Sequence, residues 1–95
     1  MNRGANFEDR GGLKANLESC KLIGANLEDT NLSGANLRAA KLKGANLENA
    51  NLRSCDLAAA DIEGANLKGT NLHKTNLKGA NLVNCNFDIR SISSR

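Results

Sequence analysis

Three cysteines and one histidine are the side chains of this sequence best able to do chemistry. Cys20, Cys55 and Cys85 form an odd set without Cys-x-x-Cys spacing, which argues against a disulfide framework. Cysteines that form no disulfide framework are typical of proteins in a reducing compartment. The sequence therefore predicts a cytoplasmic or nuclear protein.

His73 has no catalytic setting in the sequence. A general base works beside a nucleophile and an orienting carboxylate, and the spacing around His73 forces neither of them nearby. The Gly-Ala-Asn triplets resemble phosphate loops, but no GxxxxGK[ST] motif occurs. The sequence predicts no catalytic residue, no cofactor-binding residue, no metal ligand and no cofactor, and a protein that is not an enzyme.

Composition and charge narrow the classes of partner. The 95 residues include two Phe, no Tyr and no Trp, so the interior must be built from small aliphatic side chains. The net charge of +3 arises from interspersed charges, which indicate neither a nucleic acid nor a membrane surface as partner. No apolar run reaches the roughly 18 residues that span a bilayer, and residues 1–4 do not resemble a signal peptide.

A five-residue repeat explains how these side chains are positioned. From Ala5 the chain divides into 18 consecutive pentads without insertion or deletion. The third position is Leu, Ile or Phe in 17 pentads, the first is Ala, Cys or Thr in 16, and the second is Asn in 12. Chance does not produce this pattern, and it predicts a repeat architecture.

The period of five fits neither a helix nor a flat strand. On a helix, five residues turn about 500°, so successive Leu would spiral round the rod. On a strand, successive Leu would alternate faces. The consistent solution is a short extended segment followed by a turn, with first and third positions pointing inward. Gly closes six pentads where such a turn needs positive φ, and the Asn side chains are expected to bond to the backbone or to each other at corners.

These ANLxx pentads resemble the pentapeptide-repeat family over residues 5 to 94. The resemblance implies an all-β fold, a right-handed quadrilateral β-helix with four pentads (20 residues) in each turn and about four to five coils. It implies a single domain over 5–94, flanked by residues 1–4 and 95. Residues 6–9 and 12–18 are also similar to the repeat region of BTB-domain proteins of the potassium-channel-tetramerisation-domain type, which serve as adaptors for cullin-RING ubiquitin ligases. No BTB domain is present in these 95 residues.

Stacking residues 20 apart predicts which side chains share a column. The predicted structural core column reads Phe7, Leu27, Leu47, Leu67 and Phe87, with the two Phe near opposite ends. Cys20, Cys55 and Cys85 fall in three different columns, and Lys41–Asp61 and Lys43–Glu63 become ion pairs between coils. The pentad RGGLK departs from the pattern, and a bulge there would bring Leu13 inward.

An acidic strip is the one surface feature that rises above the background. The candidate interaction face comprises Glu8, Asp9, Glu28, Asp29 and Glu48. Stacked carboxylates about 5 Å apart repel one another, so the strip is either ordinary solvated charge or a contact surface for a basic partner.

These observations favour a non-enzymatic scaffold for protein–protein interaction, and the resemblance to BTB-domain proteins implies the recognition module of a larger adaptor. The partner is a protein of unknown identity, and end-to-end packing of solenoids offers a route to oligomers. The alternative is a DNA mimic that inhibits DNA gyrase, as some bacterial members of the family do. Those members are strongly acidic, longer and dimeric through a terminal helix, whereas this chain carries +3.

Overall fold

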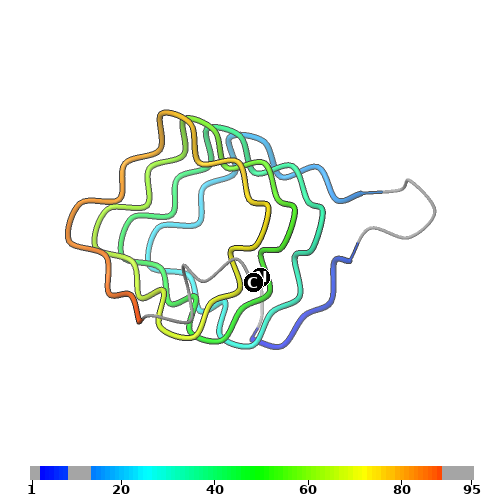
Figure 1. The fold of residues 1–95 in the computed structure, drawn as a ribbon, viewed down its shortest axis with the longest axis horizontal. Coiled ribbons are helices and arrows are strands. Elements are labelled where there is room, and N and C mark those ends of the chain that lie inside the picture. Colours follow the sequence, from blue (N-terminus) through cyan, green and yellow to red (C-terminus); the bar gives the residue numbers. More distant parts are fainter. Residues whose placement is uncertain (1–2, 9–13, 89–95) are drawn as a thin grey trace.

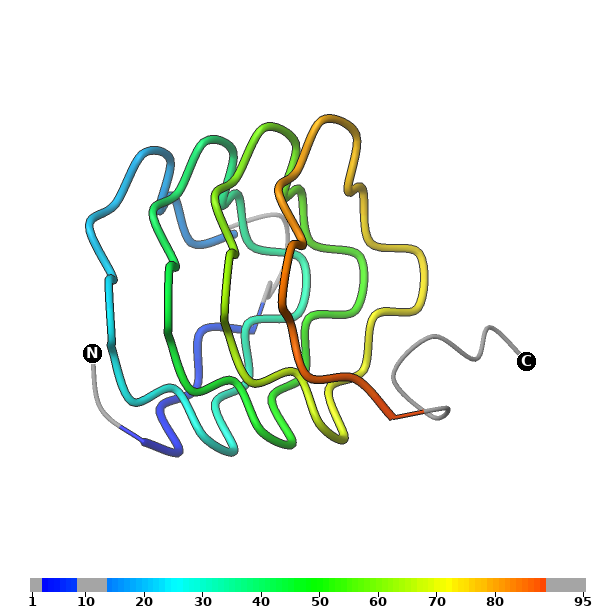
Figure 2. The same ribbon diagram turned by 90° about the vertical axis from the view of Figure 1, so that its left-hand side faces the viewer.

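The computed structural model describes residues 3–8 and 14–88. Figures 1 and 2 show the chain as a stack of similar coils that turn at repeated corners. In the described ranges there is no helix and no strand longer than a single bridge. Twelve isolated parallel bridges join second positions of the repeat in successive coils. No helix in these ranges is long and apolar enough to cross a membrane.

Each pentad is tied to its neighbours by three kinds of backbone hydrogen bond. At the centre of the solenoid the Leu47 amide donates to the Asn66 carbonyl at 2.8 Å, and the Asn49 amide donates to the Lys68 carbonyl at 2.9 Å. In the opposite direction the Asn66 amide donates to the Ala45 carbonyl at 2.9 Å. Because these bonds repeat round the coil, the backbone is paired without extended strands.

The register is 20 residues except in the first coil, where it is 25. Asn16 bridges to Asn36 and Asn26 to Asn46, but Asn6 bridges to Asn31. The first coil therefore holds one pentad more than the others, and residues 9–13, which include the first four residues of RGGLK, lie outside the described residues. The expected bulge at Leu13 falls there too. Among the described residues the bridged second positions therefore form four levels on each face of the solenoid.

The longer first coil overturns part of the predicted core column. The Phe7 amide donates to the Asn31 carbonyl at 2.6 Å, so Phe7 stacks under Leu32 and not under Leu27. The two Phe therefore do not share a column. The uniform spacing of 20 failed there because a whole extra pentad leaves the apolar residues of all later pentads in phase.

The interior consists of third and first positions, as the repeat predicts. Leu27, Leu47 and Leu67 are at most 1% exposed, and Ala, Thr and Cys at first positions pack between the leucines. Phe7 is half-buried and Phe87 is 37% exposed, because both lie in end coils. Burial of each interior leucine is worth about 1.5–3 kcal/mol relative to exposure.

Every fifth position from Ser19 to Asn84 has positive φ. The six glycines predicted to close turns do so, with φ between 67° and 77°. Eight other residues share this conformation, among them Ala39, Ala59 and Lys74. A turn bond closes each corner, such as the Ala40 amide donating to the Leu37 carbonyl at 3.0 Å. Left-handed φ at a non-glycine residue costs about 1–2 kcal/mol, so the coil imposes this geometry on residues that do not favour it.

The second-position asparagines stabilise the corners through their side chains. The Asn46 Oδ1 atom accepts the Glu48 amide at 3.0 Å, and the same bond recurs at most Asn positions. The Asn86 Nδ2 atom also donates to the Asn66 Oδ1 atom of the coil below at 3.3 Å. The predicted roles, backbone bonds and ladders, are both confirmed.

Restoring asparagine at Lys41 is expected to stabilise the fold. Lys41 occupies a second position but has no acceptor for the Lys43 amide. Lys41→Asn should raise the free energy of unfolding by about 0.5–1.5 kcal/mol, the net value of one hydrogen bond. The matched loss is Asn46→Ala, which should lower it by a similar amount. Urea denaturation of both variants measures these changes. If both substitutions raised, or both lowered, the free energy of unfolding, the corner role of asparagine would be contradicted.

Candidate functional site

The three cysteines lie in different columns, as the spacing of 20 predicts. All three are free, and the Cys55 Sγ atom donates to the Leu32 carbonyl at 2.8 Å. Burial raises the pKa of the Cys55 thiol to about 11, and burial also raises the pKa of Cys85. Cys55 is therefore a neutral, unreactive core residue near pH 7. The compartment inferred from these thiols stays a prediction.

The titratable residues in the described part of the chain form no metal site. No set of three or more His, Cys, Asp or Glu side chains there is arranged to hold a metal ion. The predicted ion pairs Lys41–Asp61 and Lys43–Glu63 are stacked as expected, but neither is formed. Long exposed lysines lose side-chain entropy when they pair, which offsets a weak screened attraction.

The ion pair between Arg38 and Asp56 was not predicted from the sequence. The Arg38 Nη1 atom lies 3.2 Å from the Asp56 Oδ2 atom. The Ala58 amide, donating to the Asp56 Oδ1 atom at 3.1 Å, and then Arg38 hold the pKa of the Asp56 carboxyl below its usual value. Both bonds arise because Asp56 occupies the second repeat position, where most pentads have asparagine. They therefore stabilise a corner of the coil and do not indicate a binding site.

The structure divides the predicted acidic strip. Glu8 lies under Ser33 in the column that continues to Arg53 and His73, on a different corner from Glu28. Asp9 lies outside the described residues. Only Glu28, Asp29 and Glu48 remain together, and we call these three residues the acidic corner. The prediction that Glu8 belongs with them is wrong because the first coil holds 25 residues.

Arg3 is the cation of the acidic corner, and the sequence reasoning missed it. Its Nη2 atom lies 3.0 Å from the Asp29 Oδ2 atom and 3.4 Å from the Glu28 Oε2 atom. The Gly4 amide donates to the Glu28 carbonyl at 2.9 Å, which places Arg3 one level below Glu28. The sequence analysis treated Arg3 as a residue flanking the repeats and so gave it no place on the solenoid. The departure of RGGLK from the repeat pattern was the one sequence signal that the first coil is shifted. Glu48 has its own donor, the Asn66 Nδ2 atom at 3.3 Å.

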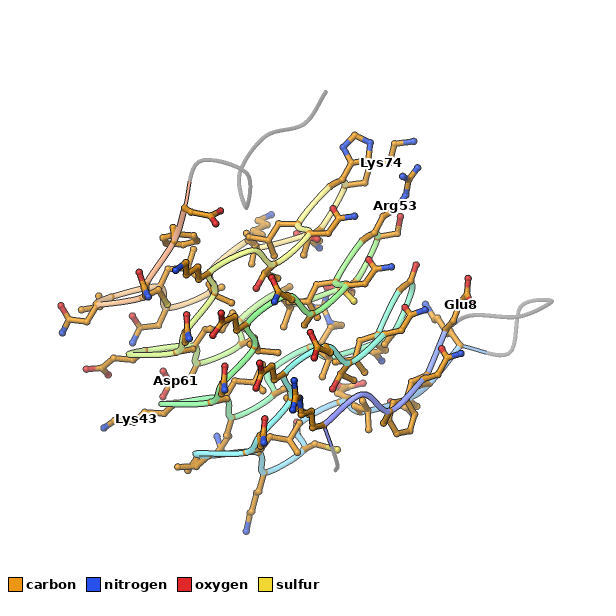
Figure 3. All side chains as sticks on the ribbon, turned by 90° about the horizontal axis from the view of Figure 1, so that it is seen from below. Glu8, Lys43, Arg53, Asp61 and Lys74 are labelled. Atoms are coloured by element: carbon orange, nitrogen blue, oxygen red, sulfur yellow. The ribbon has the colours of Figure 1, made fainter. Side chains whose placement is uncertain are left out.

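A basic corner occupies the column that contains Glu8. Arg53 lies one level below His73 and Lys74, which are neighbours in the sequence, and Figure 3 shows Arg53 and Lys74 projecting along the same edge as Glu8. His73 lies directly above Arg53, as predicted, because the Ser54 amide donates to the His73 carbonyl at 2.9 Å. The pattern of charge thus runs from acidic to basic along this corner.

Comparisons with known proteins agree with this geometry. The family model "Pentapeptide repeats" matches residues 14–49 and 50–88 in eight copies. Among solved structures, a pentapeptide repeat protein of the Arabidopsis thaliana thylakoid lumen superposes with a TM-score of 0.81 at 30% identity, covering 94% of this chain and 61% of that one. The chain thus spans about three fifths of that relative's length.

Two cyanobacterial structures are also similar. HetL of Nostoc sp. strain PCC 7120, involved in heterocyst differentiation regulation, has 26% identity and a TM-score of 0.49, over 97% of this chain and 48% of HetL. Rfr23 of Cyanothece 51142 has 39% identity and a TM-score of 0.43, over 90% of this chain and 63% of Rfr23. No curated protein matches.

Proposed function

The chain belongs to the pentapeptide-repeat family, and on that premise we propose that it is a rigid scaffold that binds a protein partner through the acidic corner. The family fold is a right-handed quadrilateral β-helix, and its members are generally interaction proteins and not enzymes. The inward positions of this chain are uniform, whereas the outward positions vary from corner to corner. Such a surface distinguishes partners by charge and shape.

The contact that carries the proposal is the one made by Arg3. Its guanidinium reaches two carboxylates of neighbouring outward positions, at 3.0 and 3.4 Å. The Arg3 side chain is 59% exposed, so the pairing is screened by water and weak enough for a partner to displace. An arginine-bearing segment of a partner fits this corner in the same way. The fold does not require acids here, because the same repeat positions carry Arg53 and Lys78 elsewhere.

Reversing charge at the acidic corner is expected to weaken partner binding. The variant Glu28→Lys with Glu48→Lys should keep its free energy of unfolding within about 1 kcal/mol, since both side chains point outward. Affinity for the protein captured by the wild-type chain should fall, and the salt dependence of binding should become smaller. Calorimetric titration at two salt concentrations measures both.

The matched control is Glu63→Lys, which changes the same repeat position on another corner. The control should bind like the wild type. Binding that survives the double reversal would return the acidic corner to plain solvated charge, and equal losses in the control would mean that net charge alone governs the interaction.

A finer proposal makes the coil the recognition module of a larger ubiquitin-ligase adaptor with a BTB domain. It rests on the resemblance at residues 6–9 and 12–18 and on nothing in the geometry. Affinity capture with the full-length parent protein tests it: a cullin among the bound proteins supports the adaptor role, and a partner set without one removes it.

The described residues give the DNA-mimic alternative little support. A mimic of B-form DNA needs rows of negative charge, whereas this chain has a net charge of +3 and a basic corner at Arg53, His73 and Lys74. A gyrase supercoiling assay decides this alternative, because only a mimic inhibits the enzyme.

A further inference from the structure

Large exposed apolar side chains are confined to the end coils of the described solenoid. The three large ones are Ile23, 64% exposed, Val83, 57% exposed, and Phe87, 37% exposed. Ile23 and Val83 occupy the same outward repeat position in one column, at its first and last levels. The two levels between them carry Lys43 and Glu63. This column of outward positions is charged at its two middle levels and apolar at its first and last levels. The pattern indicates that the two ends of the solenoid contact an apolar surface.

The two ends also expose complementary backbone edges. In the middle coils the Leu57 amide donates upward to the Asn76 carbonyl at 2.8 Å, and the Asn36 amide donates downward to the Ala15 carbonyl at 2.9 Å. At the last level the Leu77 amide has no such partner among the described residues, and at the first level the Asn16 amide has none. Open parallel edges of this kind add a further strand when one is offered.

Stacking one copy on another matches side chains at three corners. If the first coil of an upper copy continues the last coil of a lower one, Ile23 of the upper copy lies over Val83. At the other two corners, acids of the upper copy lie over basic residues of the lower one: Glu18 over Lys78 and Glu8 over His73.

The second positions also continue their ladders, with asparagine over asparagine: Asn6 over Asn71 and Asn16 over Asn76. At the fourth corner Arg3 of the upper copy and Asp88 of the lower one reach the same level, so only one chain end fits there.

We propose that the protein associates head to tail with further copies of itself, joined by the column that ends in Ile23 and Val83. Each open edge presents both amides and carbonyls, so the acidic residues of the first coil over the basic residues of the last coil favour contacts between unlike ends. A head-to-tail contact between unlike patches does not close, so it produces rods that lengthen with concentration.

Two single variants and their mixture test the proposal. Ile23→Lys blocks the first coil and Val83→Lys blocks the last, and both sites are exposed, so circular dichroism should match the wild type. Sedimentation velocity of the wild-type chain should show species that grow past the dimer with concentration, whereas each variant alone should stay monomeric. An equimolar mixture should form a one-to-one dimer that grows no further, because one intact first coil meets one intact last coil.

The other outcomes overturn the proposal. A monomeric wild-type chain at all concentrations removes self-association. A dimer of Ile23→Lys alone means that last coils pair with each other, and a dimer of Val83→Lys alone means that first coils do. Lys43→Ala, in the same column at mid-solenoid, is the control and should assemble like the wild type.

Discussion

Replacing Leu47 with aspartate is expected to abolish folding. Leu47 is fully buried at mid-solenoid, with coils both above and below it. The change removes about 1.5–3 kcal/mol of apolar burial, and placing a carboxylate in the interior costs more. A chain of this size is stable by only about 5–14 kcal/mol, and a break at mid-solenoid also separates the coils that support each other. Circular dichroism and urea denaturation measure the loss.

The neighbouring position provides the control. Glu48→Ser alters an outward side chain whose bond to the Asn66 Nδ2 atom is 3.3 Å long, so the free energy of unfolding should change by less than about 0.5 kcal/mol. Equal tolerance at the two positions would show that the inward register is wrong.

The second large effect is a difference in sign between two buried threonines. The Thr70 Oγ1 atom donates to the Leu47 carbonyl at 2.7 Å, and Thr75 makes the same bond to Leu52. The Thr30 Oγ1 atom, equally buried, has no hydrogen-bond partner. Ala5 lies beneath Thr30 in the 25-residue first coil, so the carbonyl equivalent to that of Leu47 belongs to residue 2, outside the described residues.

Thr70→Val should therefore destabilise the protein and Thr30→Val should stabilise it. Loss of the Thr70 bond costs about 1 kcal/mol, while removal of an unsatisfied buried hydroxyl gains about 1–3 kcal/mol. Thermal unfolding should show melting temperatures shifted in opposite directions from the wild type. A lower melting temperature for both variants would mean that the Thr30 hydroxyl is satisfied.

The repeat predicted most of the interior and little of the first coil. Residues from Ala15 onward stack at the spacing of 20 because each pentad supplies one inward leucine and one small residue. A whole inserted pentad keeps the later pentads in phase, so the departure of RGGLK was the one sign of it in the sequence. The misplacement of Glu8 and the omission of Arg3 follow from this alone.

Backbone conformation was also predicted only in part. Glycine marks positive φ in six pentads, but Ala39, Ala59 and Lys74 adopt the same conformation without any residue signal. The coil geometry requires the turn at every corner, so tertiary pairing overrides local preference there.

Disulfide trapping tests the central claim, the 25-residue first coil, most directly. In a chain with Cys20, Cys55 and Cys85 replaced by alanine, Glu8→Cys is combined with either Ser33→Cys or Glu28→Cys. Stacked positions lie about 4.8 Å apart, within the roughly 4.4–6.8 Å between Cα atoms that a disulfide spans. The structure predicts that dilute oxidation closes the pair 8 and 33 within one chain and leaves the pair 8 and 28 open. Closure of 8 with 28 and not with 33 would contradict it.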